Sequence, residues 1–177
     1  MEGKPAINGK DLVGACGIYC GLCMKYQSKA KSRCIGCKLG EQHDWCSIWR
    51  CCVKKHGFET CAECGEYPCE RYARRRQKDP KGWILPDENL KDIKHGREDW
   101  LKEQIERRLL AEKMLENYNE GRSMSFYCKS CTKLPVDLIE EAIGKAEKKF
   151  ESDGIEKADI KTRAKILKAI IKDSKFR

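Results

Sequence analysis

The sequence lacks any long apolar segment. No run approaches the roughly 18 apolar residues of a membrane span, and residues 1–5 contain no apolar core of a signal peptide. We therefore expect a cytoplasmic protein without membrane contact. The glycine-rich loops that bind nucleotides are also missing, and only three histidines occur. These absences disfavour the common nucleotide-binding classes and a Ser/His/Asp triad. No pair of nucleophile and base can be named, which disfavours an enzymatic activity.

Large aliphatic side chains are scarce in residues 12–70, whereas cysteine is abundant. So small a segment rarely folds by apolar burial alone, and metal–thiolate bonds would supply the missing free energy because binding and folding are coupled. Eleven of the thirteen cysteines lie within residues 16–69. The predicted metal ligands are Cys16, Cys20, Cys23, Cys34, Cys37, Cys46, Cys51, Cys52, Cys61, Cys64, Cys69, Cys128 and Cys131.

Three C-x2-C pairs stand among the eleven cysteines of residues 16–69: Cys20/Cys23, Cys34/Cys37 and Cys61/Cys64. Two intervening residues give a tight turn that can point both sulfurs at one ion, and Gly21, Gly36 and Gly65 are expected to ease the bend. Disulfides are the competing explanation. They are disfavoured because the number of cysteines is odd and the expected compartment is reducing.

Four thiolates around one ion suit structural Zn²⁺, and eleven cysteines could fill two such sites, possibly three. His43 or His56 could supply a twelfth ligand. The alternative is a [4Fe–4S] cluster, which uses the same ligands. The C-x3-C-x2-C spacing of Cys16, Cys20 and Cys23 equals that of radical S-adenosylmethionine enzymes, but the large α/β barrel of those enzymes has no counterpart here.

Apolar residues recur at helical spacing in the second half of the chain and are expected on buried helix faces. They form three series: Leu101, Ile105 and Leu109; Leu138, Ile139, Ala142, Ile143, Ala146 and Phe150; and Ile160, Ala164, Leu167 and Ile171. The pattern predicts helices over residues 98–119, from Pro135 to about residue 152, and around Ile160 to Ile171, with a basic helix over residues 68–76. The predicted fold class is α plus irregular. A small, metal-stabilised cysteine-rich domain with zinc-knuckle-like loops and short helices (12–72) precedes a basic helix and connector (73–97) and a helical region (98–177).

Cys128 and Cys131 form a C-x2-C pair within the helical region. Three roles are open: a knuckle that docks on the metal site of the first domain, two buried thiols, or a redox dithiol. The last needs a thiolate of low pKa, for which Lys129 and Lys133 would be the nearby cations.

The formal net charge of +9 raises the possibility of nucleic-acid binding through Arg74, Arg75, Arg76 and the lysines of the last helix. Eight thiolates holding two Zn²⁺ would add −8 + 4 = −4 and leave about +5. Because acidic residues interrupt these basic runs, a solvated surface is the competing interpretation.

The order of the motifs is itself informative. C-G-I-Y-C-G-L-C over residues 16–23, C-I-G-C over 34–37 and C-A-E-C-G-E-Y-P-C over 61–69 resemble an uncharacterised cysteine-rich family of archaea and bacteria, DUF3795. The resemblance covers roughly residues 12–131 and implies metal binding without an established activity. The expected function is a structural zinc module that presents a surface to a protein or nucleic acid. The alternatives are an iron–sulfur protein in electron transfer or redox sensing, and a thiol redox enzyme using Cys128 and Cys131.

Overall fold

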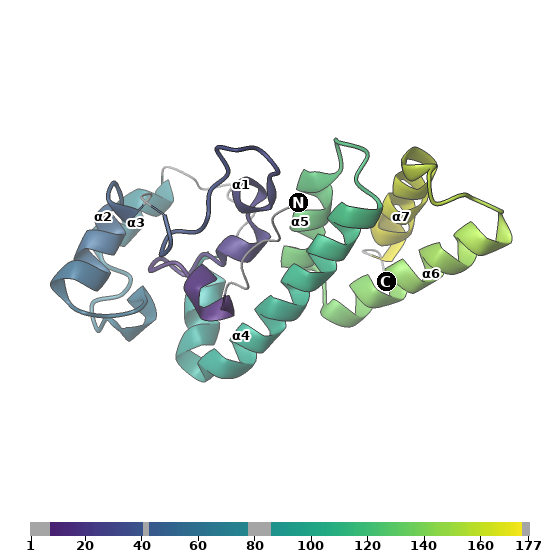
Figure 1. The fold of residues 1–177 in the computed structure, drawn as a ribbon. Helices are drawn as coiled ribbons and strands as arrows, with labels where there is room; N and C mark the ends of the chain where they lie inside the picture. Colours follow the sequence, from purple (N-terminus) through teal and green to yellow (C-terminus); the bar gives the residue numbers. More distant parts are fainter. Residues whose placement is uncertain (1–7, 41–42, 78–85, 175–177) are drawn as a thin grey trace. The chain divides into compact units, whose positions relative to one another are not determined.

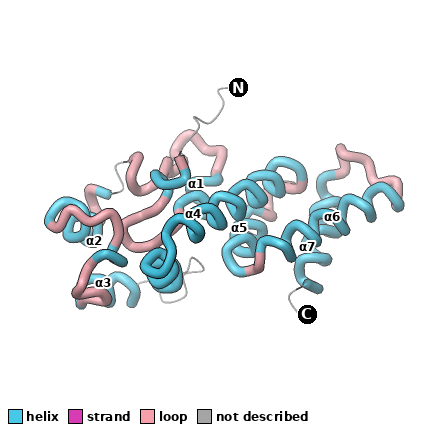
Figure 2. Tube along the Cα trace, turned by 90° about the horizontal axis from the view of Figure 1, so that it is seen from below, coloured by secondary structure: helices cyan, strands magenta, loops and turns pink. Residues whose placement is uncertain are grey.

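The computed structural model describes residues 8–40, 43–77 and 86–174 of the chain. These residues are mostly helical and contain no strand, apart from one isolated antiparallel bridge between Val13 and Tyr19 (Figures 1 and 2). An irregular cysteine-rich region precedes a helical part, as the sequence predicts. None of the helices in the described ranges is both long enough and apolar enough to cross a membrane.

Two compact units make up the chain, Met1–Ile105 and Glu106–Arg177. The boundary between them lies inside one helix, beyond the predicted boundary at residues 97 and 98. The predicted three-part division of the chain stays a prediction.

The first unit consists of short helical segments joined by irregular turns (Figure 1). The predicted basic helix exists and begins at Glu70, two residues after Pro68. The segments are η1 (Gly9–Leu12), η2 (Cys20–Leu22), α1 (Met24–Gln27), α2 (Ser47–Trp49), η4 (Arg50–Lys55), η5 (Cys61–Glu63) and α3 (Glu70–Gln77).

The long helix α4 (Pro86–Asn117) is bent at Gly96, where φ is −175° and ψ is 77°. The helical pattern of the sequence predicts only the portion after the bend. The earlier turns escape this pattern because charged side chains dominate them. Residues 78–85, which belong to the predicted connector, lie outside the described residues.

The first turns of α4 hold the loop that carries Cys16 and Cys20. Gly17 adopts a φ of +86°, and a Cβ placed there would lie 2.6 Å from both the Leu90 Cγ and the Pro86 carbonyl oxygen. The Asn89 amide donates a hydrogen bond of 2.8 Å to the Gly17 carbonyl. The cysteine region and the start of α4 therefore form one packed unit.

The second unit contains the end of α4 with α5 (Met124–Lys133), α6 (Val136–Ser152) and α7 (Ile160–Ser174), and α6 packs on α7 (Figure 1). The predicted buried side of α6 is confirmed for Ile139, Ala142, Ile143, Ala146 and Phe150, whereas Leu138 is half-buried. The helix α5, which contains Cys128 and Cys131, is absent from the sequence prediction.

Two apolar residues assigned to buried helix faces are exposed, Leu109 at 53% and Ile160 at 38%. The spacing of apolar residues along α4 does not distinguish the exposed side, where Leu109 lies, from the buried side. Ile160 is exposed at the start of α7, as the first residue of that helix. Arg163 is instead buried. Its guanidinium lies 4.5 Å from the Phe150 ring centroid and 3.1 Å from the Glu147 carboxylate, and these contacts explain how a charge is accommodated in this core.

Candidate metal centre

Two of the three C-x2-C pairs fold into the same backbone turn. The amide of Cys23 donates to the Cys20 carbonyl at 2.9 Å, and the amide of Cys64 donates to the Cys61 carbonyl at 3.2 Å. Each turn is 3-10 helical and brings its two cysteines to the same short bend. Such turns can present two sulfurs to one ion, as the spacing predicts.

The third pair, Cys34/Cys37, has an irregular turn built on Gly36. This glycine has a φ of +110°, and its amide donates to the Cys34 sulfur at 3.4 Å. An amide directed at a sulfur stabilises the thiolate form, which is the form that binds metal. The expected role of glycine is confirmed here but is wrong for Gly21 and Gly65, which have no left-handed backbone. Their turns close in the 3-10 conformation that any residue adopts.

One group of cysteines, the first group, comprises Cys16, Cys20, Cys37 and Cys46. The thiols of Cys20 and Cys37 share a hydrogen bond, and this bond together with burial raises the pKa of Cys37. Burial raises the pKa of Cys16 to about 11, and the nearby Cys37 and Cys46 contribute to the increase. Separate segments of the chain thus converge on one region.

A second group, Cys51, Cys52, Cys61, Cys64 and Cys69, lines one cavity with about 20 Å³ of free interior. Helix η4, the η5 turn and the residue before α3 contribute these cysteines, and other lining residues include His56, Tyr67 and Tyr72. This second group therefore gathers around a space of its own.

Within the second group the thiols of Cys52 and Cys61 share a hydrogen bond, which lowers the pKa of Cys52 and raises that of Cys61. The nearby Cys16 and Cys69 also raise the pKa of Cys61. The Cys61 amide donates to the Ala15 carbonyl at 2.8 Å and so ties this group to the loop of the first one.

The thiols meet in pairs. Across residues 8–40, 43–77 and 86–174, no three Cys, His, Asp or Glu side chains are positioned so that they could hold one metal ion. No disulfide joins the eleven cysteines of residues 16–69. The ligand roles predicted for the cysteines, Cys23 and Cys34 included, therefore stay predictions.

The two candidate histidine ligands differ in their surroundings. His43 bonds through Nδ1 to the Cys37 carbonyl at 3.0 Å, and its Nε2 lies 3.4 Å from the Asp44 carboxylate. Both ring nitrogens of His43 thus face oxygen atoms. His56 stacks on Phe58 with ring centroids 5.7 Å apart and lines the cavity of the second group. Of the two, His56 is the better placed to join a set of thiolate ligands.

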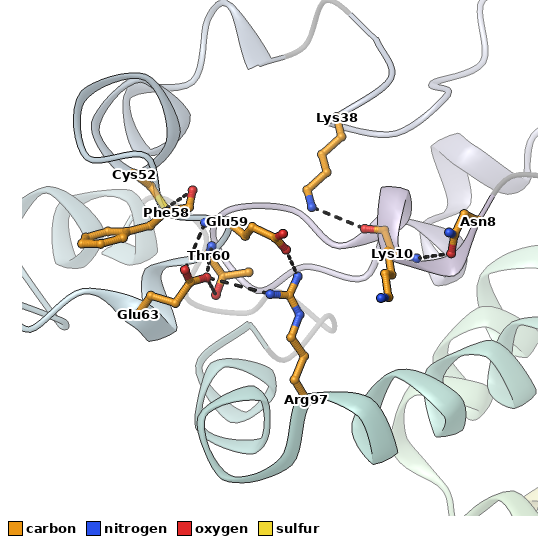
Figure 3. A network of polar contacts seen from close by, with 9 residues as sticks. All are labelled: Asn8, Lys10, Lys38, Cys52, Phe58, Glu59, Thr60, Glu63 and Arg97. Carbon is orange, nitrogen blue, oxygen red and sulfur yellow. Dashed lines mark hydrogen bonds and ion pairs between the residues drawn. The ribbon is translucent and has the colours of Figure 1, made fainter.

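A polar network connects α4 to the cysteine region, and the sequence prediction did not include it (Figure 3). Arg97 pairs with Glu59 and lies 4.0 Å from Glu63, whose side chain accepts the Thr60 amide at 2.9 Å. The hydrogen bond from Arg97 lowers the pKa of Glu59. The T-x-x-E sequence at residues 60–63 is a capping box directly before Cys64, and this signal is visible in the sequence.

Cys128 and Cys131 lie on α5 and are fully buried. Burial raises the pKa of Cys131 to about 12, and the neighbouring Cys128 adds to the effect. Arg107 donates hydrogen bonds of 2.6 Å to the carbonyls of Cys131 and Leu134. A redox dithiol needs an accessible thiolate of low pKa. These surroundings favour the alternative of two buried thiols.

The cysteine region matches one known protein family. Residues 12–74 match the family described as "Protein of unknown function (DUF3795)". The resemblance inferred from the cysteine motifs is therefore confirmed over residues 12–74, and the match does not extend to the expected residue 131. No curated protein and no solved structure matches the chain.

Proposed function

We propose that the first unit is a structural metal module that binds two Zn²⁺ ions, one at each cysteine group. One observation carries the proposal: cysteines that are far apart in sequence converge in two places within residues 12–70, where large aliphatic side chains are scarce. A small domain of this kind commonly takes its stability from thiolate–metal bonds. The module has no assigned catalytic residue and acts in a reducing cytoplasm, where thiols persist.

The donor set fits zinc. All the proposed donors are thiols, and one proposed pair, Cys61/Cys64, sits on a 3-10 turn. Sulfur donors on tight turns are typical of structural zinc sites.

The second group lines a small cavity with a free interior of about 20 Å³. Thiolates gathered from several segments suit a structural Zn²⁺ ion, and a [4Fe–4S] cluster, which uses the same ligands, is the alternative that metal analysis distinguishes. The proposed ligands at this cavity are Cys52, Cys61, Cys64 and Cys69, and those of the first group are Cys16, Cys20, Cys37 and Cys46.

The test compares paired substitutions in the full chain. Cys20→Ser with Cys37→Ser should remove one zinc per chain, and so should Cys61→Ser with Cys64→Ser, because each pair belongs to a different group. Cys128→Ser with Cys131→Ser is the matched control and should leave the zinc content unchanged. If neither of the first two variants loses metal, the proposal is wrong. Near-UV circular dichroism that is unchanged after complete chelation would contradict the structural role of the metal.

A further inference from the structure

One stretch of the cysteine region is strongly basic. Residues 25–55 contain eight Lys or Arg and two Asp or Glu, which gives this stretch a formal charge of 8 − 2 = +6. Six of the eight cations are exposed: Lys25, Lys29, Lys31, Arg50, Lys54 and Lys55. The proposed zinc thiolates are instead buried or half-buried. The surface of this stretch is therefore basic even with its thiols ionised.

The same stretch carries the most exposed large apolar side chain of the described residues, Trp45 at 87%. Two exposed cations lie on the helical segment that follows it. Arg50 and Lys54 are four residues apart in the helical segment formed by α2 and η4 and so share a side of it. The Lys54 ammonium lies 3.7 Å from the carboxylate of Asp44, the residue next to Trp45.

Contacts on both sides of Trp45 hold the neighbouring residues in place. The ring of His43 lies 4.9 Å from that of Trp49, and the Arg50 amide donates to the Cys46 carbonyl at 3.0 Å. Trp45 thus stands between two anchored neighbours, with Cys46 in the first cysteine group. The indole therefore presents its apolar face to solvent from a fixed position.

We propose that Trp45, Arg50 and Lys54 form a binding surface for single-stranded nucleic acid, which deepens the proposed function by naming the partner of the zinc module. An unstacked base has an apolar face that can stack on the indole, and its flanking phosphates are anions that pair with the two cations. A buried apolar partner would not account for six exposed cations in the same stretch as the indole. A duplex hides the faces of its bases, so it would not use the tryptophan.

The experiment measures binding of the full zinc-loaded protein to a fluorescein-labelled 12-nucleotide poly-U strand, from roughly 50 mM salt upward. Trp45→Ala should weaken binding about 5- to 100-fold, the range for loss of one stacked base, and Trp45→Phe should retain most of the affinity. Leu39→Ala, which removes a 42% exposed side chain of the same region, should have little effect.

A pair of charge variants separates specific binding from the effect of net charge. Arg50→Ala with Lys54→Ala should lower the slope of log affinity against log salt by about 0.7 for each phosphate that the variant no longer neutralises. Lys161→Ala with Lys165→Ala removes the same charge from exposed positions of α7 and should change the slope less. Zinc content is measured on every variant, so failure of the zinc proposal is seen independently of strand binding.

Two results would overturn the inference and leave the zinc proposal intact: zinc-loaded protein that does not bind the strand at about 50 mM salt, and binding that Trp45→Ala does not weaken. Equal competition by a duplex of the same length would also overturn it, because the indole would then have no role.

Discussion

Replacing Gly17 by Ala tests whether the first turns of α4 belong to the cysteine domain. Gly17 has a φ of +86°, and an added Cβ would lie 2.6 Å from the Leu90 Cγ and the Pro86 carbonyl oxygen. The backbone carbonyl cannot yield without moving the start of α4. The substitution thus combines an unfavourable backbone conformation with a steric overlap.

Each effect has a known size. A non-glycine residue in the left-handed region costs about 1–2 kcal/mol, and forcing an extra carbon into packed structure costs about 1–3 kcal/mol. Gly17→Ala should therefore destabilise the first unit by about 2–5 kcal/mol. Gly57→Ala is the matched control, because Gly57 has a φ of +71° with nothing within 4 Å of the added Cβ. It should cost only about 1–2 kcal/mol.

Urea unfolding followed by tryptophan fluorescence measures the difference. All four tryptophans precede residue 106, so their fluorescence reports on the first unit even if the second unfolds separately. A cost for Gly17→Ala that is no larger than the cost for Gly57→Ala would refute the packing of α4 on the cysteine loop.

Three further predictions concern the boundaries and charges of the two units. A fragment of residues 8–105 should fold with its zinc, whereas a fragment of residues 12–74 should not, because it lacks the α4 residues that contact Gly17 and Glu59. Zinc retained after gel filtration distinguishes the two fragments, and a folded 12–74 fragment would disprove the prediction. Arg97→Ala should destabilise the first unit by less than about 1 kcal/mol, since its pair with Glu59 is largely exposed. Arg97 lowers the pKa of Glu59, so this ion pair stabilises the fold above the ordinary carboxyl pKa and stops doing so as the pH falls through the lowered pKa of Glu59. The difference in unfolding free energy between wild type and Arg97→Ala should therefore shrink on acidification below about pH 4. A difference that grows would refute the assignment. Cys128 and Cys131 should react with thiol reagents only at the rate at which the second unit opens, because both are fully buried; fast labelling of native protein, followed by mass spectrometry, would contradict this.

The sequence predicts most reliably what depends on local pattern. The buried side of α6 follows from apolar residues at helical spacing, and the C-x2-C turns follow from ligand spacing. The left-handed Gly17 could not be predicted, because its need arises from Leu90 and Pro86, more than sixty residues later. The helix α5 escapes prediction because cysteine, serine and threonine are frequent in it, and these have low helix propensity.

The grouping of the cysteines depends on tertiary structure in the same way. Order along the chain does not indicate that Cys20 meets Cys37 or that Cys52 meets Cys61, since interleaved pairing is as compatible with the spacing as sequential pairing. The surface around Trp45 is hard to predict for a different reason. A consecutive basic run such as residues 74–76 is conspicuous in the sequence, whereas the exposed cations of residues 25–55 are dispersed along it.

Metal content per chain tests the central claim most directly. Protein purified without oxygen should be colourless and contain about two zinc ions per chain, a number that each paired substitution at a cysteine group lowers by one. Brown protein that contains iron and absorbs at about 400 nm would contradict the zinc assignment. Natively folded protein that contains no stoichiometric metal would contradict the account as a whole.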